Sequence, residues 1–103
     1  MSQYKPTLAI DLDGVIGKNP MRNCQVREGA STVIYQLKKR YKIIIWTARH
    51  IKNYERTKKW LIENGIPFDK LVMGKLRFDK YIDSKVVKFR NWEQIKKNSH
   101  KTS

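Results

Sequence analysis

The fold is decided by the stretch Thr7-Leu-Ala-Ile-Asp-Leu-Asp-Gly14, a short β-prone run that ends in two carboxylates and a glycine. The run 42–46 is similar and holds three consecutive isoleucines, which is typical of a strand buried on both faces of a parallel sheet. Between the two runs, apolar residues recur at helical spacing over 30–37, and the basic residues 38–40 are expected to fill the last turn of that helix. These segments together predict a βαβ unit.

The rest of the chain continues the alternation of strands and helices. A second helix is predicted over about residues 53–63, because Asn64-Gly65 is a stop signal and Pro67 follows closely. Further short strands are expected at 71–72, 81–83 and 86–89, followed by a short helix at 92–97 and a frayed polar tail at 98–103. The alternation predicts an α/β fold, a single-domain, doubly wound, mostly parallel sheet, with its core domain over residues 1–97.

The segment between Gly14 and Trp46 is just long enough for one loop, one helix and one strand, so we expect no cap domain. Residues 15–28 are expected to form at most a flap. This flap would carry Asn19, Met21 and Arg22. Without a cap, water must be excluded by a large substrate or by a neighbouring subunit, which makes a homo-oligomer one of the expected arrangements.

The composition is strongly basic and points to an anionic partner. The 103 residues contain 23 Lys and Arg against 9 Asp and Glu, a formal net charge of +14. Such an excess suits phosphorylated small molecules, nucleic acid or a membrane surface. The longest clean apolar run, 43–46, is far too short to span a membrane, and residues 1–6 lack a signal-peptide pattern. We therefore expect a cytoplasmic protein without a membrane partner, and its single cysteine, Cys24, excludes an intrachain disulfide.

Carboxylates gather where the predicted strands end. In open α/β sheets, ligands bind beyond the carboxyl ends of the strands, and Asp11, Asp13 and Asp83 all fall at such ends. Three converging carboxylates would repel one another unless a divalent cation neutralised them. Because the ligands would all be oxygens, and because Cys24, His50 and His100 make no zinc spacing, the pattern predicts a Mg²⁺ site.

Four segments resemble, in order and spacing, the signature motifs of the haloacid dehalogenase superfamily. They are 11–15, 43–49, Gly74-Lys75 and 81–83, within a resemblance that spans about residues 7–90. The chain is most similar to the small, capless phosphatases assigned to capsular or lipopolysaccharide biosynthesis. It departs from them at Ser84, where they usually have a second acid, and at Leu76, where they tend to have proline.

The resemblance implies a role for each carboxylate. Asp11 would be the nucleophile that forms an aspartyl-phosphate, and Asp13 would be the general acid and base. Asp11 and Asp83, together with Asp13 through its carbonyl, would hold Mg²⁺.

The resemblance also implies roles for residues of the other motifs. Thr47 would hydrogen-bond a phosphoryl oxygen, and Lys75 would offset the charge of the phosphate. Gly14 would permit a tight turn and a close approach of the backbone to phosphate. Arg49 either clamps the substrate phosphate or lies on the surface.

Three functional hypotheses follow. The first is a Mg²⁺-dependent phosphomonoesterase acting on a phosphorylated sugar or related metabolite. The second is a phosphatase of nucleotides or of 3′- or 5′-phosphorylated nucleic-acid ends, which the net charge of +14 favours. The third is an inactive basic binding module, and the complete set of motif residues argues against it.

We also expect binding to nucleic acid to be weak and non-specific. Lysines and arginines are spread over both predicted helices, the loops and the tail, whereas a dedicated nucleic-acid binder would gather them on one face. Most aromatic side chains fall in runs that are expected to face the core, so few should be exposed for stacking on bases. The examples are Tyr35, Trp46, Trp60 and Phe89.

Overall fold

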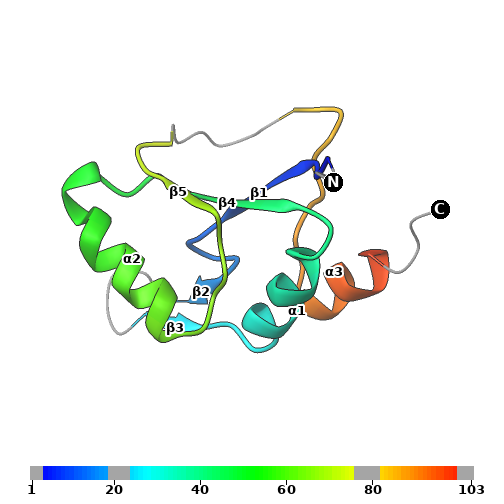
Figure 1. The fold of residues 1–103 in the computed structure, drawn as a ribbon, viewed down its shortest axis with the longest axis horizontal. Coiled ribbons are helices and arrows are strands. Elements are labelled where there is room, and N and C mark those ends of the chain that lie inside the picture. The colour runs from blue at the N-terminus through cyan, green and yellow to red at the C-terminus, as the bar shows by residue number, and fades with distance from the viewer. Residues whose placement is uncertain (1–3, 19–23, 76–81, 100–103) are drawn as a thin grey trace.

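The computed structural model describes residues 4–18, 24–75 and 82–99 (Figure 1). Its elements in chain order are β1 (Thr7–Asp11), β2 (Gly17–Lys18), β3 (Gln25–Val26), α1 (Ala30–Leu37), β4 (Lys42–Trp46), the 3₁₀ helix η1 (Ile51–Asn53), α2 (Tyr54–Glu63), β5 (Lys70–Val72) and α3 (Trp92–Ser99). Within these described ranges no helix is long and apolar enough to cross a membrane.

Strands β1, β4 and β5 form a parallel sheet in the order β1-β4-β5. In the register, Asp11 lies opposite Trp46, and Trp46 lies opposite Val72. The three strands therefore end level with one another, which brings the loops that follow them to one edge. The predicted α/β fold with a parallel sheet is confirmed, and β1 and β4 have the predicted bounds.

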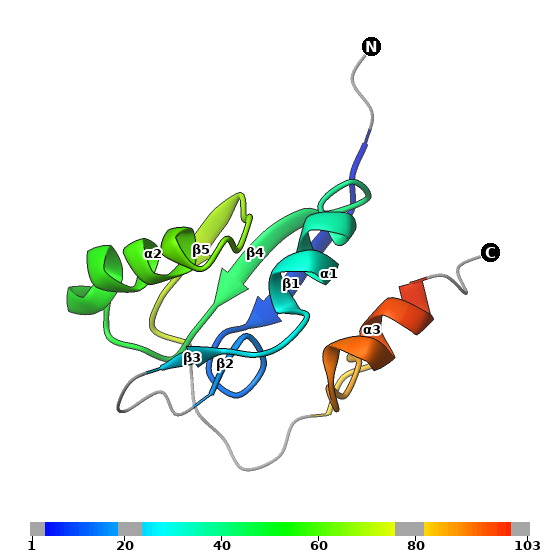
Figure 2. The same cartoon turned by 90° about the horizontal axis from the view of Figure 1, so that it is seen from below.

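The two crossover helices, α1 and α2, lie on the same side of this sheet (Figures 1 and 2). Right-handed crossovers that step in one direction across a sheet place their helices on one face. Their apolar sides pack against alternate strand residues, such as Ile10, Ile43 and Ile45, and Trp92 from α3 completes the core. The buried core residues are Ile10, Leu12, Ile16, Ala30, Val33, Ile34, Leu37, Ile43, Ile45, Leu61, Ile66, Leu71 and Trp92.

The opposite face of the sheet is less covered. Ala9 is exposed and Ile44 is half-buried, so the three isoleucines of β4 are not all buried on both faces as predicted. The expectation for the aromatic side chains is wrong at two positions, because Trp46 keeps 39% and Tyr35 63% of its surface exposed. The alternation of side chains along β4 points Ile43 and Ile45 toward the helices and leaves Trp46 on the other face.

The ends of two helices differ from the prediction. Helix α1 ends at Leu37, so the basic residues 38–40 lie in the turn beyond it rather than in its last turn. There the N–H of Arg40 bonds the carbonyl of Leu37, a three-residue spacing that closes a tight turn. Helix α3 continues to Ser99, so residues 98–99, which we assigned to the polar tail, are helical.

The two predicted strands after β5 do not form among the described residues. Ile82 and Asp83 are not part of a strand, and Tyr81 lies outside the described residues. The backbone N–H of Lys85 donates to Oδ1 of Asp83 at 3.0 Å, so the chain turns at 84–85 instead of continuing as a strand. The β-prone run 86–89 is also not a strand, because a strand needs a hydrogen-bonded neighbour and not only suitable side chains.

A small hairpin occupies the region that we predicted to be a flap. β2 and β3 pair antiparallel, with Gly17 opposite Val26. Gly17 packs closely against α2, since a Cβ built on it would lie 2.7 Å from the Cys24 sulfur and 3.1 Å from the Trp60 ring. Asn19, Met21 and Arg22, which the flap was expected to carry, lie outside the described residues, as do Leu76 and His100.

Candidate functional site

The turn after β1 brings Asp11 and Asp13 to the carboxyl edge of the sheet. Asp11 is the last residue of β1, and the side chain of Leu12 is fully buried. The carbonyl of Leu12 accepts hydrogen bonds from the N–H groups of Ile16 and Gly17, at 2.9 and 3.0 Å. Gly14 has a left-handed conformation with φ 88°, which costs glycine little and lets the chain reverse here. The tight turn predicted at Gly14 is therefore present.

The loops after β4 and β5 are bonded to each other. The N–H of Lys75 donates to the carbonyl of Thr47 at 2.9 Å, and the N–H of Gly74 donates to the carbonyl of Arg49 at 3.0 Å. The side chain of Thr47 is fully buried. These bonds bring the predicted motif residues Thr47, Arg49 and Lys75 to the same edge as the two aspartates.

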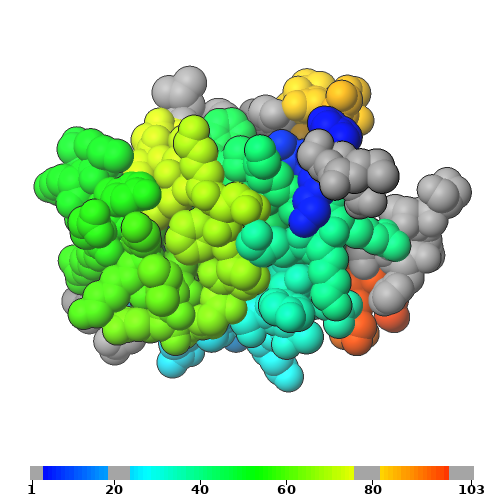
Figure 3. All heavy atoms as spheres, in the orientation of Figure 1, coloured from blue at the N-terminus to red at the C-terminus, as the bar shows by residue number. Residues whose placement is uncertain are grey.

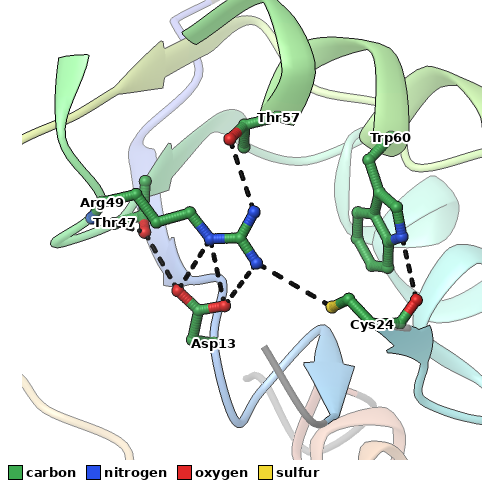
Figure 4. A network of polar contacts seen from close by, with 6 residues as sticks. All are labelled: Asp13, Cys24, Thr47, Arg49, Thr57 and Trp60. Carbon is green, nitrogen blue, oxygen red and sulfur yellow. Dashed lines mark hydrogen bonds and ion pairs between the residues drawn. The ribbon is translucent and has the colours of Figure 1, made fainter. Parts of the chain in front are cut away.

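Asp13 is held on both carboxylate oxygens (Figure 4). The Arg49 guanidinium donates from Nη2 to Oδ1 at 2.7 Å and from Nε to Oδ2 at 3.1 Å. The Thr47 hydroxyl donates to Oδ2 at 3.3 Å and accepts the N–H of Arg49 at 3.2 Å. This hydrogen bonding to Asp13 raises the pKa of the Arg49 guanidinium above its ordinary value. Arg49 and Thr47 thus contact an acidic side chain in this structure, and their predicted contacts with phosphate stay predictions.

The far side of Arg49 contacts α2 and the hairpin (Figure 4). Nη1 donates to the hydroxyl of Thr57 at 3.4 Å, and Nη2 lies 3.9 Å from the sulfur of Cys24. The Trp60 indole N–H donates to the carbonyl of Cys24 at 3.0 Å, so α2 also holds the hairpin. The sequence analysis did not predict these contacts: it did not single out Thr57, it expected Trp60 only to face the core, and it used Cys24 only to exclude an intrachain disulfide and a zinc spacing. Thr57 had one signal, since it lies four residues before the buried Leu61 on the same face of α2.

Asp11 has a looser environment. The ammonium of Lys75 lies 3.7 Å from Oδ2 of Asp11 and 5.0 Å from the centre of the Trp46 ring. Burial raises the pKa of Asp11 above its ordinary value, and the nearby Lys75 charge opposes that rise. The side chain of Asp11 is still 41% exposed, so a reacting group can reach it.

Asp11, Lys75 and Asp83 line one cavity of about 640 Å³ along β1. Trp46 and Phe89 are among the residues that line its apolar part. Although Asp83 does not end a strand as predicted, the exposed segment that carries it, gold in Figure 3, brings it to the same cavity as Asp11. Ser84, the position of the expected second acid, is exposed in the adjoining turn.

The Mg²⁺ prediction fits part of this arrangement. In the part of the chain that the structure describes, no three His, Cys, Asp or Glu side chains are grouped closely enough to hold a metal ion. The Asp13 carboxylate is bound to Arg49, and the role predicted for the backbone carbonyl of Asp13 stays a prediction, whereas Asp11 and Asp83 line a common cavity. Mg²⁺ commonly uses one or two carboxylates together with substrate phosphates, so these two oxygen donors are of the right type.

Comparison with known proteins bears on the fold. A chain in the solved structure of the Pnkp1/Rnl/Hen1 RNA repair complex is similar, with a TM-score of 0.60 and 22% sequence identity. The likeness covers 91% of this chain but 30% of that chain. No protein-family model matches the sequence, and no curated protein sequence matches it. The molecule is thus an α/β domain with acidic and basic side chains gathered at the carboxyl edge of its sheet, and its fold recurs within a longer chain.

Proposed function

We propose that this chain is a phosphomonoesterase with Asp11 as its nucleophile. The observation that supports this most is the pairing of Asp11 with Lys75 in an open cavity at the strand ends, with an oriented second carboxylate, Asp13, two residues further on. A lysine beside a reacting carboxylate offsets the negative charge that a phosphate brings to it.

The reaction would proceed in two displacements. A carboxylate oxygen of Asp11 forms a bond to phosphorus while the bond from phosphorus to the leaving oxygen breaks, and Asp13 gives that oxygen a proton. Water then attacks the phosphorus of the aspartyl-phosphate and passes its proton to Asp13. The bond between phosphorus and Asp11 breaks, which releases inorganic phosphate, restores the Asp11 carboxylate and leaves Asp13 in the protonated form from which it started.

Mg²⁺ fits this proposal as a cation that would be held by Asp11, by Asp83 and by the backbone carbonyl of Asp13. When bound, it would supply positive charge that lets an anionic substrate approach an anionic nucleophile. Lys75 contributes to the same end through its own charge, 3.7 Å from Asp11.

The test is hydrolysis of an aryl phosphate, such as p-nitrophenyl phosphate, by the purified chain. We expect slow release of inorganic phosphate with Mg²⁺, loss of activity with a chelator, and recovery when excess Mg²⁺ is added. Hydrolysis that resists the chelator would contradict the role of the cation. If neither this ester nor any phosphate monoester in a broad screen is hydrolysed, the proposed activity is wrong.

The leading substrate class is a phosphorylated sugar or related metabolite, which follows from the resemblance of the sequence. A second candidate is a phosphorylated nucleic-acid end. It is favoured by the net charge of +14, by the exposed Trp46 ring beside Asp11, and by the fold shared with a chain of an RNA repair complex. Inorganic phosphate released from sugar phosphates, nucleotides and 3′- and 5′-phosphorylated oligonucleotides, compared at equal concentration, distinguishes the two.

A further inference from the structure

We propose that Arg49 is a positioning residue for Asp13 and not a clamp for the substrate phosphate. The inference rests on the proposed phosphomonoesterase function, in which Asp13 moves the proton to the leaving oxygen. It goes further than that function because it states that Arg49 orients the general acid Asp13 and does not bind the substrate.

The Arg49 guanidinium uses both of its binding edges on other residues of the chain. A guanidinium binds a phosphate or carboxylate through two parallel N–H groups on one edge. The edge made by Nε and Nη2 is used on Asp13, at 3.1 and 2.7 Å. The edge made by Nη1 and Nη2 faces Thr57 and Cys24, at 3.4 and 3.9 Å. Both edges that could bind phosphate bidentately are therefore occupied by the protein itself.

Helix α2 and the β2–β3 hairpin, which contact the far side of Arg49, are themselves tightly packed. Thr57 is 1% exposed in the middle of α2, so its hydroxyl cannot move away without disturbing the core. The carbonyl of Cys24 is held by the Trp60 indole, and Gly17 packs directly on the Cys24 sulfur. Helix α2 and the hairpin thus hold the arginine in position, and the arginine holds the carboxylate.

The chemical consequence concerns proton transfer. A general acid must point at the leaving oxygen, and an error of about 1 Å in position can cost on the order of 10²-fold in rate. Thr47 and Arg49 together leave the Asp13 carboxylate one orientation, because each of its oxygens has a donor within 3.3 Å. Lysine could keep the charge at position 49 but not the two parallel donors.

The experiment compares Arg49→Met and Arg49→Lys with wild type on two phosphate monoesters with different leaving groups. An aryl phosphate leaves as a stable anion and needs little help from an acid, whereas an alkyl phosphate needs a proton. We expect Arg49→Met to lower kcat/KM, which reports the first displacement, by about 10²-fold on the alkyl ester and by much less on the aryl ester. Arg49→Lys should show the same selectivity, and added guanidinium should partly restore Arg49→Met.

Three further variants complete the comparison. Asp13→Asn removes the general acid itself, so its relative losses on the alkyl and aryl esters are the reference for the other variants. Thr57→Val removes one hydroxyl behind the guanidinium and should show a weaker form of that selectivity, on a chain whose folding is checked by thermal unfolding. Arg56→Met removes the same charge from an exposed position on α2 and should change neither ester.

The possible results distinguish failure of the positioning role of Arg49 from failure of the proposed phosphomonoesterase function. Equal losses on both esters with a raised KM in Arg49→Met, alongside the selective loss in Asp13→Asn, would show a phosphate clamp and overturn the positioning role. Failure of the wild type to hydrolyse either ester would overturn the proposed function itself. If Arg49→Met does not fold, Arg49→Lys and Thr57→Val decide instead. A selective loss on the alkyl ester in these two variants confirms the positioning role, and equal losses on both esters overturn it.

Discussion

The two aspartates of the site lie two residues apart and are held very differently. Asp13 has hydrogen-bond donors on both carboxylate oxygens, from Arg49 and Thr47, within 3.3 Å. Asp11 has its cationic partner, Lys75, at 3.7 Å, and its side chain is 41% exposed toward the cavity that Asp83 also lines. The Asp13 half of the site is therefore closed by contacts within the protein, and the Asp11 half is open to solvent.

The difference follows the chemistry that we propose for each carboxylate. A group that transfers a proton gains from a fixed direction, so contacts that orient it raise the rate. A nucleophile must meet phosphorus and a cation, and protein contacts on its oxygens would compete with both. Substitutions at Asp11 and Lys75 are therefore expected to have larger effects on the reaction than substitutions in the surrounding scaffold.

The largest effect is expected at the nucleophile. Asp11→Asn should lower aryl-phosphate turnover by on the order of 10³-fold or more, because an amide cannot form the aspartyl-phosphate. Thermal stability should not fall, since burial already disfavours the charge of Asp11 and raises its pKa. Steady-state kinetics and thermal unfolding of the same preparation check both statements. Wild-type activity in a sequence-verified variant would rule out Asp11 as the nucleophile.

The second largest effect on activity is expected at Lys75. Lys75→Met removes the positive charge beside Asp11 and should lower kcat/KM by about 10²-fold, the usual cost of losing one charge-stabilising group. Lys75→Arg keeps the charge and should lose less. The measurement is kcat/KM on the aryl phosphate at saturating Mg²⁺. Unchanged kinetics in Lys75→Met would mean that this lysine takes no part in the reaction.

A smaller effect is expected at the cation. Ser84→Asp adds an anionic oxygen beside Asp83 and should lower the Mg²⁺ concentration needed for half-maximal activity. Ser84→Asn, which matches the size of the new side chain without its charge, is the control. Titration of activity against Mg²⁺ decides the matter, and an unchanged or higher half-maximal concentration in Ser84→Asp would show that position 84 does not face the cation.

The smallest effect is expected in the scaffold, at Asp69. Its Oδ2 accepts the N–H of Ile43 at 2.8 Å and its Oδ1 pairs with Lys38 at 3.0 Å, which ties the start of β5 to β4. The Ile43 hydrogen bond, followed by Lys38, lowers the pKa of Asp69 below its ordinary value of 3.8. Asp69→Asn should cost about 0.5–1 kcal/mol of unfolding free energy at pH 7, because the carboxylate is partly exposed.

The pH dependence of that cost has a definite sign. A lowered pKa stabilises the fold above pH 3.8, and the stabilisation disappears as the pH falls through the lower pKa of the folded state. The gap between wild type and Asp69→Asn in denaturant unfolding should therefore close in acid, with kinetics unchanged at pH 7. A gap that stays constant into acid would show that the ionised carboxylate adds nothing to stability.

Local pattern was sufficient for much of the framework. The predicted strands 7–11 and 42–46 have their observed bounds, because β-prone side chains flanked by polar residues are a local signal. The helix predicted over 53–63 is also present, as η1 and α2. The run 86–89 carries the same kind of signal and is not a strand, because strand formation depends on a neighbour that local sequence does not name.

The residues of the candidate site also differ in how far local sequence predicts their positions. The order of strands and crossovers is enough to bring Asp11, Thr47 and Lys75 to one edge, since parallel strands end together and their loops follow them. The exposure of Trp46 depends on which face the helices cover, so it could not be read from an apolar run.

By itself, therefore, the sequence determined the α/β framework and which residues stand at the strand ends, since both follow from side-chain patterns a few residues long. Only the tertiary structure decided that Arg49 turns to Asp13, with Thr57 and Cys24 behind it. Those partners lie 36, 8 and 25 positions from Arg49 in the chain. An arginine can satisfy its donors with a substrate, with water or with its own protein, and the choice among them depends on packing between segments that are distant in sequence.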